Sequence, residues 1–537
     1  MRKNLRHLLT AIIVILCGLA GWRLARDLEK TVVKSPPKPQ AAAMRPAAPP
    51  PRHVRPIHRD EFNDGTTVEM FASSSPDQVI LRFPSAESYE DFIFILANSG
   101  VELLDQIDRL RAVRLGYDDW ADLAGLLYGE NIVAYDALPA APAPAPARAS
   151  NQQGLVGFGD GLLGWLGITG DNSGWGAGVR VAVLDSGVVP HPALPGLSQS
   201  IAITPFPEDL SKTNGHGTAV ASLIAGSGPR ASGVAPSAEI ISIRVGDESG
   251  KADSFALAAG IMAAIDSGAQ IINISMGTTE NNPLIEEAVL YAHERDVLIV
   301  AASGNSEQAD AAYPAAYPTV VSVGAVDARG EHLDFSNYGS YLSLTAPGYA
   351  INAAWPGDRH TKISGTSASA PIVTGAIAAI MSSGSGVTMR ASQAAEILMN
   401  HANDAGIPGP DSEFGFGIID MGRVMNRGIR GIVDAAISDQ RIVKSSGGGH
   451  EIQVTVQNRG TVNLVNTFID ISTPVGSRQF NATTLAPGAI RTFSMPVGLA
   501  GQPKNRPLRV TSTLSLGTAG QDATPANNQR SAWVGWN

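Results

Sequence analysis

Three short segments of the chain each place a chemically capable side chain within two residues of a glycine. Asp185 follows an apolar run (VAVLDSG), His216 lies between two glycines (NGHGT), and Ser367 lies within SGTSASAP. A carboxylate, an imidazole and a hydroxyl are the groups that acyl transfer needs: an acid that orients the base, the base itself, and a nucleophile. Each segment alone also reads as an ordinary turn or helix cap, so the prediction of a hydrolase depends on the combination.

The elements expected around these residues would expose them at strand and helix ends. Asp185 ends a strand, and an apolar helix follows His216. Ser367 stands at the start of an alanine-rich helix, where backbone donors and the helix dipole favour a developing negative charge. Pro371 is expected in the first turn of that helix, where its missing N–H costs little. Asn305, in the tripeptide SGN after another apolar run, offers an amide that can stabilise an oxyanion.

The order Asp, His, Asn and Ser along one α/β region resembles that of the subtilisin-like serine proteases. The resemblance covers residues 151–425 and includes VAVLDSGV, NGHGTAVASLIAG, GVAPSAEIISIRV, INISMG, VAASGN, YPAAYPTVVSVGAVD, FSNYGSYLSLTAPG and SGTSASAP. It implies that Asp185 orients the imidazole, that His216 is general base and then acid, and that Ser367 attacks the peptide carbonyl. Asn305 and the Ser367 N–H would stabilise the oxyanion.

The same resemblance implies where a substrate binds. Ser275, Met276 and Gly277 would form an extended segment that pairs with the substrate backbone. The pocket for the substrate residue before the scissile bond would be lined by these residues, by Ala301, Ala302, Ser303 and Gly304, and by the region 311–313. Because no acidic residue stands at its base and Ala312 would narrow it, we expect a preference for small or medium apolar side chains.

Several positions depart from the family pattern. Ala219 stands where many subtilisins have a second histidine, and Ala368 stands where many have a methionine, so the site should resist oxidation. SGTSAS is also similar to a motif of the sedolisins, acidic relatives that use Glu and Asp, but His216 argues against that group. No required cofactor is expected and no metal-binding residues are assigned. A weak Ca²⁺ site built from backbone carbonyls near 313–317 stays open.

Residues 151–425 are predicted to form a subtilisin-like, doubly wound α/β fold. Strands are expected at 179–184, 240–245, 271–275, 297–302 and 320–323, and helices at 219–225, 254–267, 283–294 and 370–381. The strand candidates are continuous, β-branched apolar runs, which are typical of a parallel sheet buried on both faces. Active sites of such sheets lie at the carboxyl ends of the strands.

Residues 61–138 are predicted to form a small α+β, ferredoxin-like domain with the order β-α-β-β-α-β. Its strands are expected at 78–83, 101–110, 111–117 and 132–138, and its helices at 85–99 and 119–128. The domain resembles the propeptide of subtilisins, which implies a folding template and an intramolecular inhibitor. Pro/Ala-rich tethers, residues 31–60 and 139–150, bracket it.

Residues 426–537 are predicted to form an all-β sandwich. Strands are expected at 434–442, 451–457, 465–471, 491–496 and 508–514, separated by Gly, Pro and Asn turns. VTVQNRGTVNL, LAPGAIRTF and TPANNQRSAWV resemble bacterial cell-adhesion-related β-sandwich domains. This resemblance implies an accessory role, in binding or in stabilisation, and no part in catalysis.

The start of the chain predicts export. Arg2, Lys3 and Arg6 precede an apolar run at 8–22 that has the length of a signal-peptide core and is short for a membrane span. Residues 1–30 are therefore expected to be a signal peptide or a membrane anchor, and the chain to be secreted, periplasmic or anchored. The one cysteine, Cys17, lies in that run, so no disulfide is expected downstream of it.

Composition and motifs together predict a self-processed, exported serine endopeptidase that acts on proteins or peptides. A formal net charge of -10 gives no basic face for a nucleic-acid partner. Two alternatives stay open: a surface binding or adhesion protein with a vestigial protease domain, and a maturation protease with one target.

Overall fold

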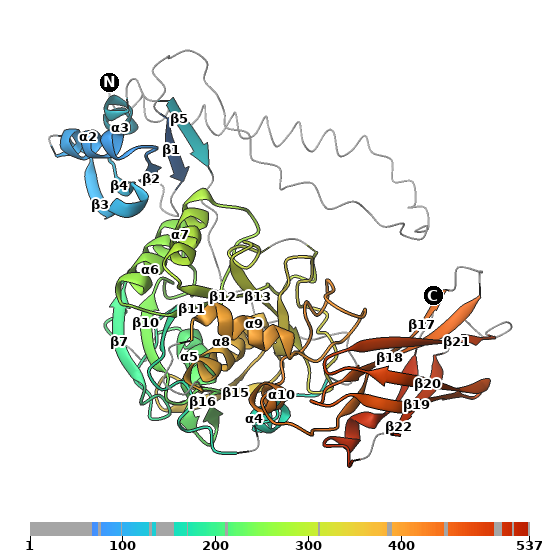
Figure 1. Ribbon diagram of the computed structural model, residues 1–537. Helices are drawn as coiled ribbons and strands as arrows, with labels where there is room; N and C mark the ends of the chain where they lie inside the picture. The colour runs from blue at the N-terminus through green and yellow to red at the C-terminus, as the bar shows by residue number, and fades with distance from the viewer. Residues whose placement is uncertain are drawn as a thin grey trace. The chain divides into compact units, whose positions relative to one another are not determined.

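The computed structural model describes most of the chain after residue 66. The described residues are 67–72, 77–97, 99–127, 131–135, 155–168, 170–209, 213–309, 312–383, 389–444, 449–498, 507–517 and 520–534. The described residues all belong to one unit of the chain by their contacts, and Figure 1 shows their helices and strands. The predicted signal segment at 1–30 and the tethers at 31–60 and 139–150 lie outside the described residues.

The first described part is a five-stranded sheet with the strand order β3-β4-β2-β1-β5. Its elements are β1 (Thr67–Ala72), β2 (Gln78–Arg82), α2 (Ala86–Leu96), β3 (Glu102–Ile107), a 3-10 turn (Asp108–Leu110), β4 (Ala112–Gly116), α3 (Trp120–Leu126) and β5 (Asn131–Tyr135). The side chain of Asp119 accepts a hydrogen bond from the Ala121 N–H and caps α3, as the sequence predicts.

The elements β2-α2-β3-β4-α3-β5 follow the predicted order β-α-β-β-α-β, but the prediction omits β1, which lies between β2 and β5 in the sheet. The alternation in TVEMFA is short, because the apolar residues Met70 and Phe71 follow each other. Val68 packs in the core of the N-terminal part, whereas Phe71 packs, from the opposite face, in the core cluster that contains α6 and α7. Adjacent apolar residues that pack on opposite faces interrupt the polar and apolar alternation that marks a half-exposed strand.

The central part is a seven-stranded sheet in which every neighbouring pair is parallel. Its strands are β6 (Arg180–Asp185), β7 (Leu197–Ala202), β10 (Glu239–Arg244), β11 (Ile271–Ile274), β12 (Leu298–Ala302), β13 (Val320–Val326) and β14 (Leu344–Pro347). The helices are α4 (Leu162–Trp165), α5 (His216–Ala225), α6 (Ser254–Asp266), α7 (Pro283–Glu294), α8 (Thr366–Ser382), α9 (Ala391–Asn400) and α10 (Met421–Asn426). The parallel sheet confirms the predicted α/β class.

Both faces of this sheet are covered by helices, as Figure 1 shows. Val181 and Val183 of β6 belong to the apolar cluster that contains α5 and α8. Ala182 and Leu184, which alternate with them, belong to the cluster that contains α6 and α7. The apolar runs are therefore continuous because each strand is buried on two sides.

The strand order places a switch point at β6. In the order β14-β13-β12-β11-β6-β10-β7, the chain leaves β6 for one side of the sheet and later returns to β11 on the other side. Ligand sites of open α/β sheets lie at such a point, outside the carboxyl ends of the strands. Asp185 is the last residue of β6.

Two short antiparallel pairs complete the central part. The strands β8 (Ser227–Gly228) and β9 (Ala231–Ser232) follow α5, and β15 (Ile351–Trp355) and β16 (Arg359–Ile363) form a hairpin directly before α8.

Helix α8 begins at Thr366 and not at 370, so Pro371 lies inside the helix and the prediction of a first-turn proline was wrong. The helix starts early because Asn305 binds the Thr366 N–H, a contact between residues far apart in the sequence.

The C-terminal part consists of two antiparallel sheets, β17-β18-β21 and β20-β19-β22-β23. The strands are β17 (Ala435–Lys444), β18 (His450–Asn458), β19 (Leu464–Thr473), β20 (Gly476–Leu485), β21 (Ile490–Val497), β22 (Leu508–Ser515) and β23 (Gln529–Val534), with a 3-10 turn at Pro525–Asn528. Residues from both sheets share one apolar core, including Val454 and Ile469. The strands β20 and β23 were not predicted, because both are largely exposed and carry little apolar pattern.

Among the helices of the described residues, none has the length and apolar character needed to cross a membrane.

Candidate active site

Asp185 and His216 are in direct contact at the carboxyl edge of the sheet. Nδ1 of His216 lies 2.9 Å from each carboxylate oxygen of Asp185. Asp185 ends β6 and is fully buried, whereas His216 begins α5 and keeps 18% of its side chain exposed. Because Nδ1 donates to the carboxylate, the tautomer that results leaves Nε2 to accept a proton.

Neighbouring polar groups hold this pair in place. The Ser186 N–H donates to Asp185 Oδ1 over 2.7 Å, and the Ser186 hydroxyl donates to the Asn214 carbonyl over 2.8 Å. The Asn214 side chain in turn accepts from the His216 N–H over 3.0 Å. A β-carbon on Gly217 would lie 2.5 Å from the Gly187 carbonyl oxygen, so this close approach of the two segments requires glycine.

The Asp185 carboxylate sets the proton affinity of His216. Burial alone would lower the pKa of His216, but attraction to the Asp185 charge and the hydrogen bond to it raise the pKa above its usual value. An imidazole with a raised pKa is a stronger base, although it is charged over a wider range of acidic pH.

Ser367 and Asn305 meet around Gly365. Ser367 is the second residue of α8 and is 5% exposed. Gly365 precedes the helix with φ of 128°, and a β-carbon there would lie 2.9 Å from Asn305 Nδ2 and 3.2 Å from Ser367 Oγ. The amide and the hydroxyl therefore flank one small volume that only glycine leaves open.

The amide of Asn305 is oriented by the start of α8. Its Oδ1 accepts hydrogen bonds from the N–H and from the hydroxyl of Thr366, each over 2.9 Å. The Thr366 hydroxyl also accepts from the Gly304 N–H over 3.2 Å. Since Oδ1 is directed at Thr366, Nδ2 lies on the side of Gly365 and Ser367.

The strands bring the two halves of the candidate site to one edge. Asp185 ends β6, and the next strand of the sheet, β11, runs directly into Ser275. The Ser275 hydroxyl donates to the Ser367 carbonyl oxygen over 3.1 Å. Asp185 and His216 are thus in contact with each other, and Asn305 and Ser367 lie at the carboxyl ends of the neighbouring strands.

The predicted substrate segment is an extended strand-like stretch. Ser275 is fully buried and Met276 is 2% exposed. The next residue, Gly277, would place a β-carbon 2.9 Å from the Tyr313 carbonyl oxygen. Thr278 and Tyr313 exchange backbone hydrogen bonds of 2.8 and 2.9 Å, which fix this segment on one side.

The predicted pocket residues also gather in one place. A β-carbon on Gly277 would lie 3.8 Å from the Ala312 side chain, and one on Gly304 would lie 3.4 Å from it. Ser303 donates its N–H to Val323 and its hydroxyl to Asn337, while Ala302 ends β12 at 6% exposed. Residues 310 and 311 lie outside the described residues.

Among the described residues, no group of three or more His, Cys, Asp or Glu side chains is arranged to hold a metal ion. In the region proposed for a weak calcium site, the carbonyls of Ala312, Tyr313 and Pro314 accept hydrogen bonds from Ala316, Thr278 and Tyr317.

Several residues that support the site were not assigned from the sequence. Ser186, Asn214 and Thr366 lie inside the recognised motifs, but their roles depend on tertiary contacts. Asn273, fully buried in β11, could have been noticed as a polar residue within the apolar run IINIS. It shares a face of the strand with Ser275, two residues later.

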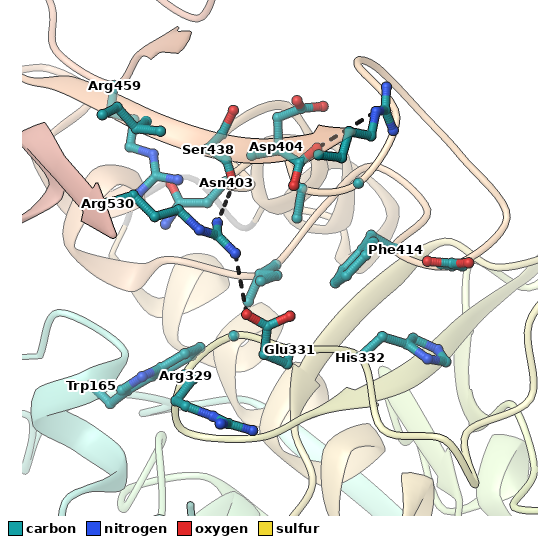
Figure 2. A pocket seen from close by; sticks show the side chains of 18 of the residues that line it. Trp165, Arg329, Glu331, His332, Asn403, Asp404, Phe414, Ser438, Arg459 and Arg530 are labelled. Carbon is teal, nitrogen blue, oxygen red and sulfur yellow. Dashed lines mark hydrogen bonds and ion pairs between the residues drawn. The ribbon is translucent and has the colours of Figure 1, made fainter. Parts of the chain in front are cut away.

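A separate cavity of about 570 Å³ lies between the central and C-terminal parts (Figure 2). Glu331 and Arg530 form an ion pair across it at 3.1 Å, and Arg530 also donates to the Ser438 carbonyl. Asp404, 3% exposed, is another lining residue. None of the predicted catalytic residues lines this cavity.

Known proteins resemble the central part of the chain. The profile of the subtilase family matches residues 176–417. Thermostable alkaline protease of Halalkalibacterium halodurans is 36% identical over 258 residues, which cover 46% of this chain and 68% of that protein. Subtilisin Savinase of Lederbergia lenta is 38% identical over 207 residues, or 38% of this chain and 77% of the relative. The solved protease domain of PatA shares 31% identity with a TM-score of 0.44, covering 48% of this chain and 97% of that one.

Proposed function

This chain belongs to the subtilase family of serine endopeptidases, and from that premise we propose that Asp185, His216 and Ser367 are its catalytic triad. The observation that carries the proposal is the buried Asp185 carboxylate 2.9 Å from Nδ1 of His216, at the sheet edge where Ser367 lies in the first turn of α8. An acid paired with an imidazole in this way supports the proposal, because such triads are defined by geometry and by roles rather than by position in the sequence.

The proposed reaction proceeds through an acyl-enzyme. Oγ of Ser367 attacks the peptide carbonyl while Nε2 of His216 takes its proton, and Asp185 stabilises the imidazolium. The oxyanion accepts hydrogen bonds from Asn305 Nδ2 and from the Ser367 N–H. This N–H belongs to the first turn of α8, where backbone N–H groups have no acceptor within the helix. His216 then gives the proton to the leaving amine, and water releases the acyl group by the same steps.

The substrate backbone is proposed to add as a strand beside Ser275, Met276 and Gly277. Ala312, close to both Gly277 and Gly304, narrows the pocket for the residue before the scissile bond. The preferred residues there are small or medium and apolar. A series of peptides that differ only at that residue tests this preference, and fastest cleavage after arginine would contradict it.

Residues 61–138 are proposed to be the prodomain, which inhibits the catalytic domain (151–425) until it is cut between Leu138 and Gly154. Contacts between the two support this role. Glu287 of α7 binds both Arg82 and Arg111, the latter over 3.1 Å. Arg114 pairs with Asp253, the residue that caps α6, and Arg109 pairs with Asp266 at the other end of that helix.

The remaining parts are assigned as follows. Residues 426–537 are proposed to be an accessory β-sandwich, and residues 1–30 a signal peptide or anchor that takes the chain out of the cytoplasm. Catalysis is proposed to need no cofactor, and calcium at most adds stability. The alternative of an adhesion protein with a vestigial protease domain receives no support from the relatives, which are named as proteases.

One experiment tests the core of the proposal. An organophosphonate probe should label the wild-type chain at Ser367 and abolish hydrolysis of casein. The Ser367→Ala variant should remain unlabelled, inactive and uncut near 138–154. As a matched control, Ser369→Ala removes a buried hydroxyl two residues away that donates to Ala346 and Pro347, and it should keep labelling. Labelling of Ser367→Ala at the same rate as the wild type would refute the assignment.

A further inference from the structure

The carbonyl group of Ser367 lacks its usual partner in helix α8. In an α-helix, each carbonyl accepts a hydrogen bond from the N–H four residues later. For Ser367 that residue is Pro371, which has no N–H. A carbonyl left unsatisfied in a buried place is costly, so this group needs a donor from outside the helix.

The hydroxyl of Ser275 supplies that donor from the end of strand β11. It donates to the Ser367 carbonyl over 3.1 Å, and it accepts from Asn273 Nδ2 over 3.0 Å. Asn273 Oδ1 in turn accepts from the hydroxyl of Thr374, further along α8, over 2.9 Å. Three side chains thus form one line of donors that runs from the middle of α8, through β11, back to the first turn of α8.

The line is shielded from water along its whole length. Ser275, Asn273 and Thr374 are each 0% exposed. Hydrogen bonds in such surroundings are stronger than in water, and a chain whose donors all point the same way strengthens each member. Water cannot take the place of any of these three polar groups, so loss of one group should change the hydrogen bond made by the next.

The first two residues of α8 are therefore held by different neighbours. Asn305 binds the Thr366 N–H on one side, and Ser275 binds the Ser367 carbonyl on the other. The helix itself contributes little to the position of Ser367, because its early N–H groups and this carbonyl have no α-helical partner. The direction of Ser367 Oγ then depends on side chains outside the first turn.

We propose that Thr374, Asn273 and Ser275 are positioning residues that fix the nucleophile through the Ser367 carbonyl. The inference rests on the proposed role of Ser367. None of the three hydroxyl and amide groups touches the reacting atoms. Thr374 acts at the greatest distance, seven residues along α8 from the nucleophile.

The sharpest test removes the hydroxyl of Thr374 and keeps the shape of the side chain. Thr374→Val should lower kcat about three- to tenfold, with KM within about twofold, because small displacements of a reacting group are costly to the rate. Thr374→Ser should restore kcat. The acid limb of the pH profile should not move, since the Asp185 and His216 pair is untouched.

A matched control separates positioning from general stability. Thr345, also fully buried, donates its hydroxyl to the Gly417 carbonyl over 3.3 Å in a different part of the core. Thr345→Val should lower the Tm to a similar extent but keep kcat, with both variants assayed well below their Tm. Equal kcat in Thr374→Val and Thr345→Val would overturn the inference.

Failure of the proposed triad gives a different result. If the organophosphonate never labels the wild-type chain, the proposed role of Ser367 is refuted, and the inference about the positioning residues falls with it. If the wild type is labelled, Ser275→Ala should slow labelling about ten- to a hundredfold while the final extent stays complete. Ser275→Thr, which keeps the hydroxyl, should recover much of the rate; unchanged labelling in Ser275→Ala would contradict the proposal.

Discussion

Both carboxylate oxygens of Asp185 lie 2.9 Å from Nδ1 of His216. The contact fixes which imidazole nitrogen carries the proton. In the mechanism proposed above, the same acid would also stabilise the positive charge that His216 gains when it takes the Ser367 proton. Neither effect survives if the carboxylate is replaced by an amide.

Asp185→Asn should lower kcat about 10⁴-fold, because the amide favours the wrong tautomer of His216. Single-turnover kinetics with a chromogenic ester measures the loss. Ser186→Ala, which keeps the carboxylate and removes a neighbouring hydroxyl, should cost far less. If the two variants were equally impaired, the acid would have no special part in catalysis.

The acid limb of kcat/KM should lie above the usual imidazole value. Asp185 raises the pKa of His216, so the imidazole is already charged, and unable to act as a base, at pH values where an ordinary histidine is neutral. In Asp185→Asn the residual activity should show this limb at lower pH. A limb at the same pH in both proteins would show that another group controls it.

Asn305→Ala should lower kcat about 10²–10³-fold with little change in KM, because the lost donor serves the oxyanion. Asn305 also binds Thr366, so a second variant is needed. Asn305→Asp keeps an acceptor for Thr366 but has no amide donor, and it should be as slow as Asn305→Ala. Near-normal activity of Asn305→Asp would mean that only the contact with Thr366 matters.

Inhibition by the prodomain should weaken with salt, because partly exposed ion pairs are screened. Glu287→Gln loosens the contacts with Arg82 and Arg111, and the self-processed chain should then gain activity at a markedly lower NaCl concentration. We expect apparent inhibition about tenfold weaker. Glu294→Gln, an exposed change on the same helix, should behave like the wild type.

Asp404 should make the protein less stable at neutral pH than at mildly acidic pH. Burial, with the nearby Asp411 charge, raises the pKa of Asp404 to about 6, despite the hydrogen bond from the Gly409 N–H. The folded chain therefore takes up a proton as the pH falls through 6, and this gain is complete only below the ordinary carboxyl pKa.

Asp404→Asn removes this penalty and keeps an acceptor for Gly409. At pH 7 it should raise the free energy of unfolding by about 1–2 kcal/mol, and near pH 4 it should make little difference. Calorimetry at the two pH values measures this. A variant that is destabilised equally at both pH values would show that ionisation of Asp404 carries no penalty in the folded chain.

Local sequence patterns predicted the interior of the fold. The strands β6, β10, β11 and β12 coincide with continuous apolar runs, because a strand covered on both faces has no reason to alternate. The edge strand β7 (Leu197–Ala202) was missed, since its exposed residues are polar and give no such run. The strand β1 was missed for a different reason: its adjacent apolar residues Met70 and Phe71 pack on opposite faces and interrupt the alternation.

The proposed catalytic residues could be picked out from the sequence because each lies in a short motif that includes its own turn or helix start. The supporting residues were not, because they depend on partners far along the chain. The hydrogen bond between Thr374 and Asn273 joins residues 101 positions apart. Only the packing of α8 on β11 brings them together.

Asn305 links the proposed oxyanion donor to the first turn of α8, which carries the proposed nucleophile. The same amide group that faces Gly365 and Ser367 also holds the Thr366 N–H, so the first turn of α8 cannot drift without carrying the amide away. Loss of the contact between Asn305 and Thr366 should therefore displace the proposed oxyanion donor and the proposed nucleophile together. Heat or denaturant should therefore lower the fraction of active molecules, while the kcat of each molecule that remains active stays unchanged.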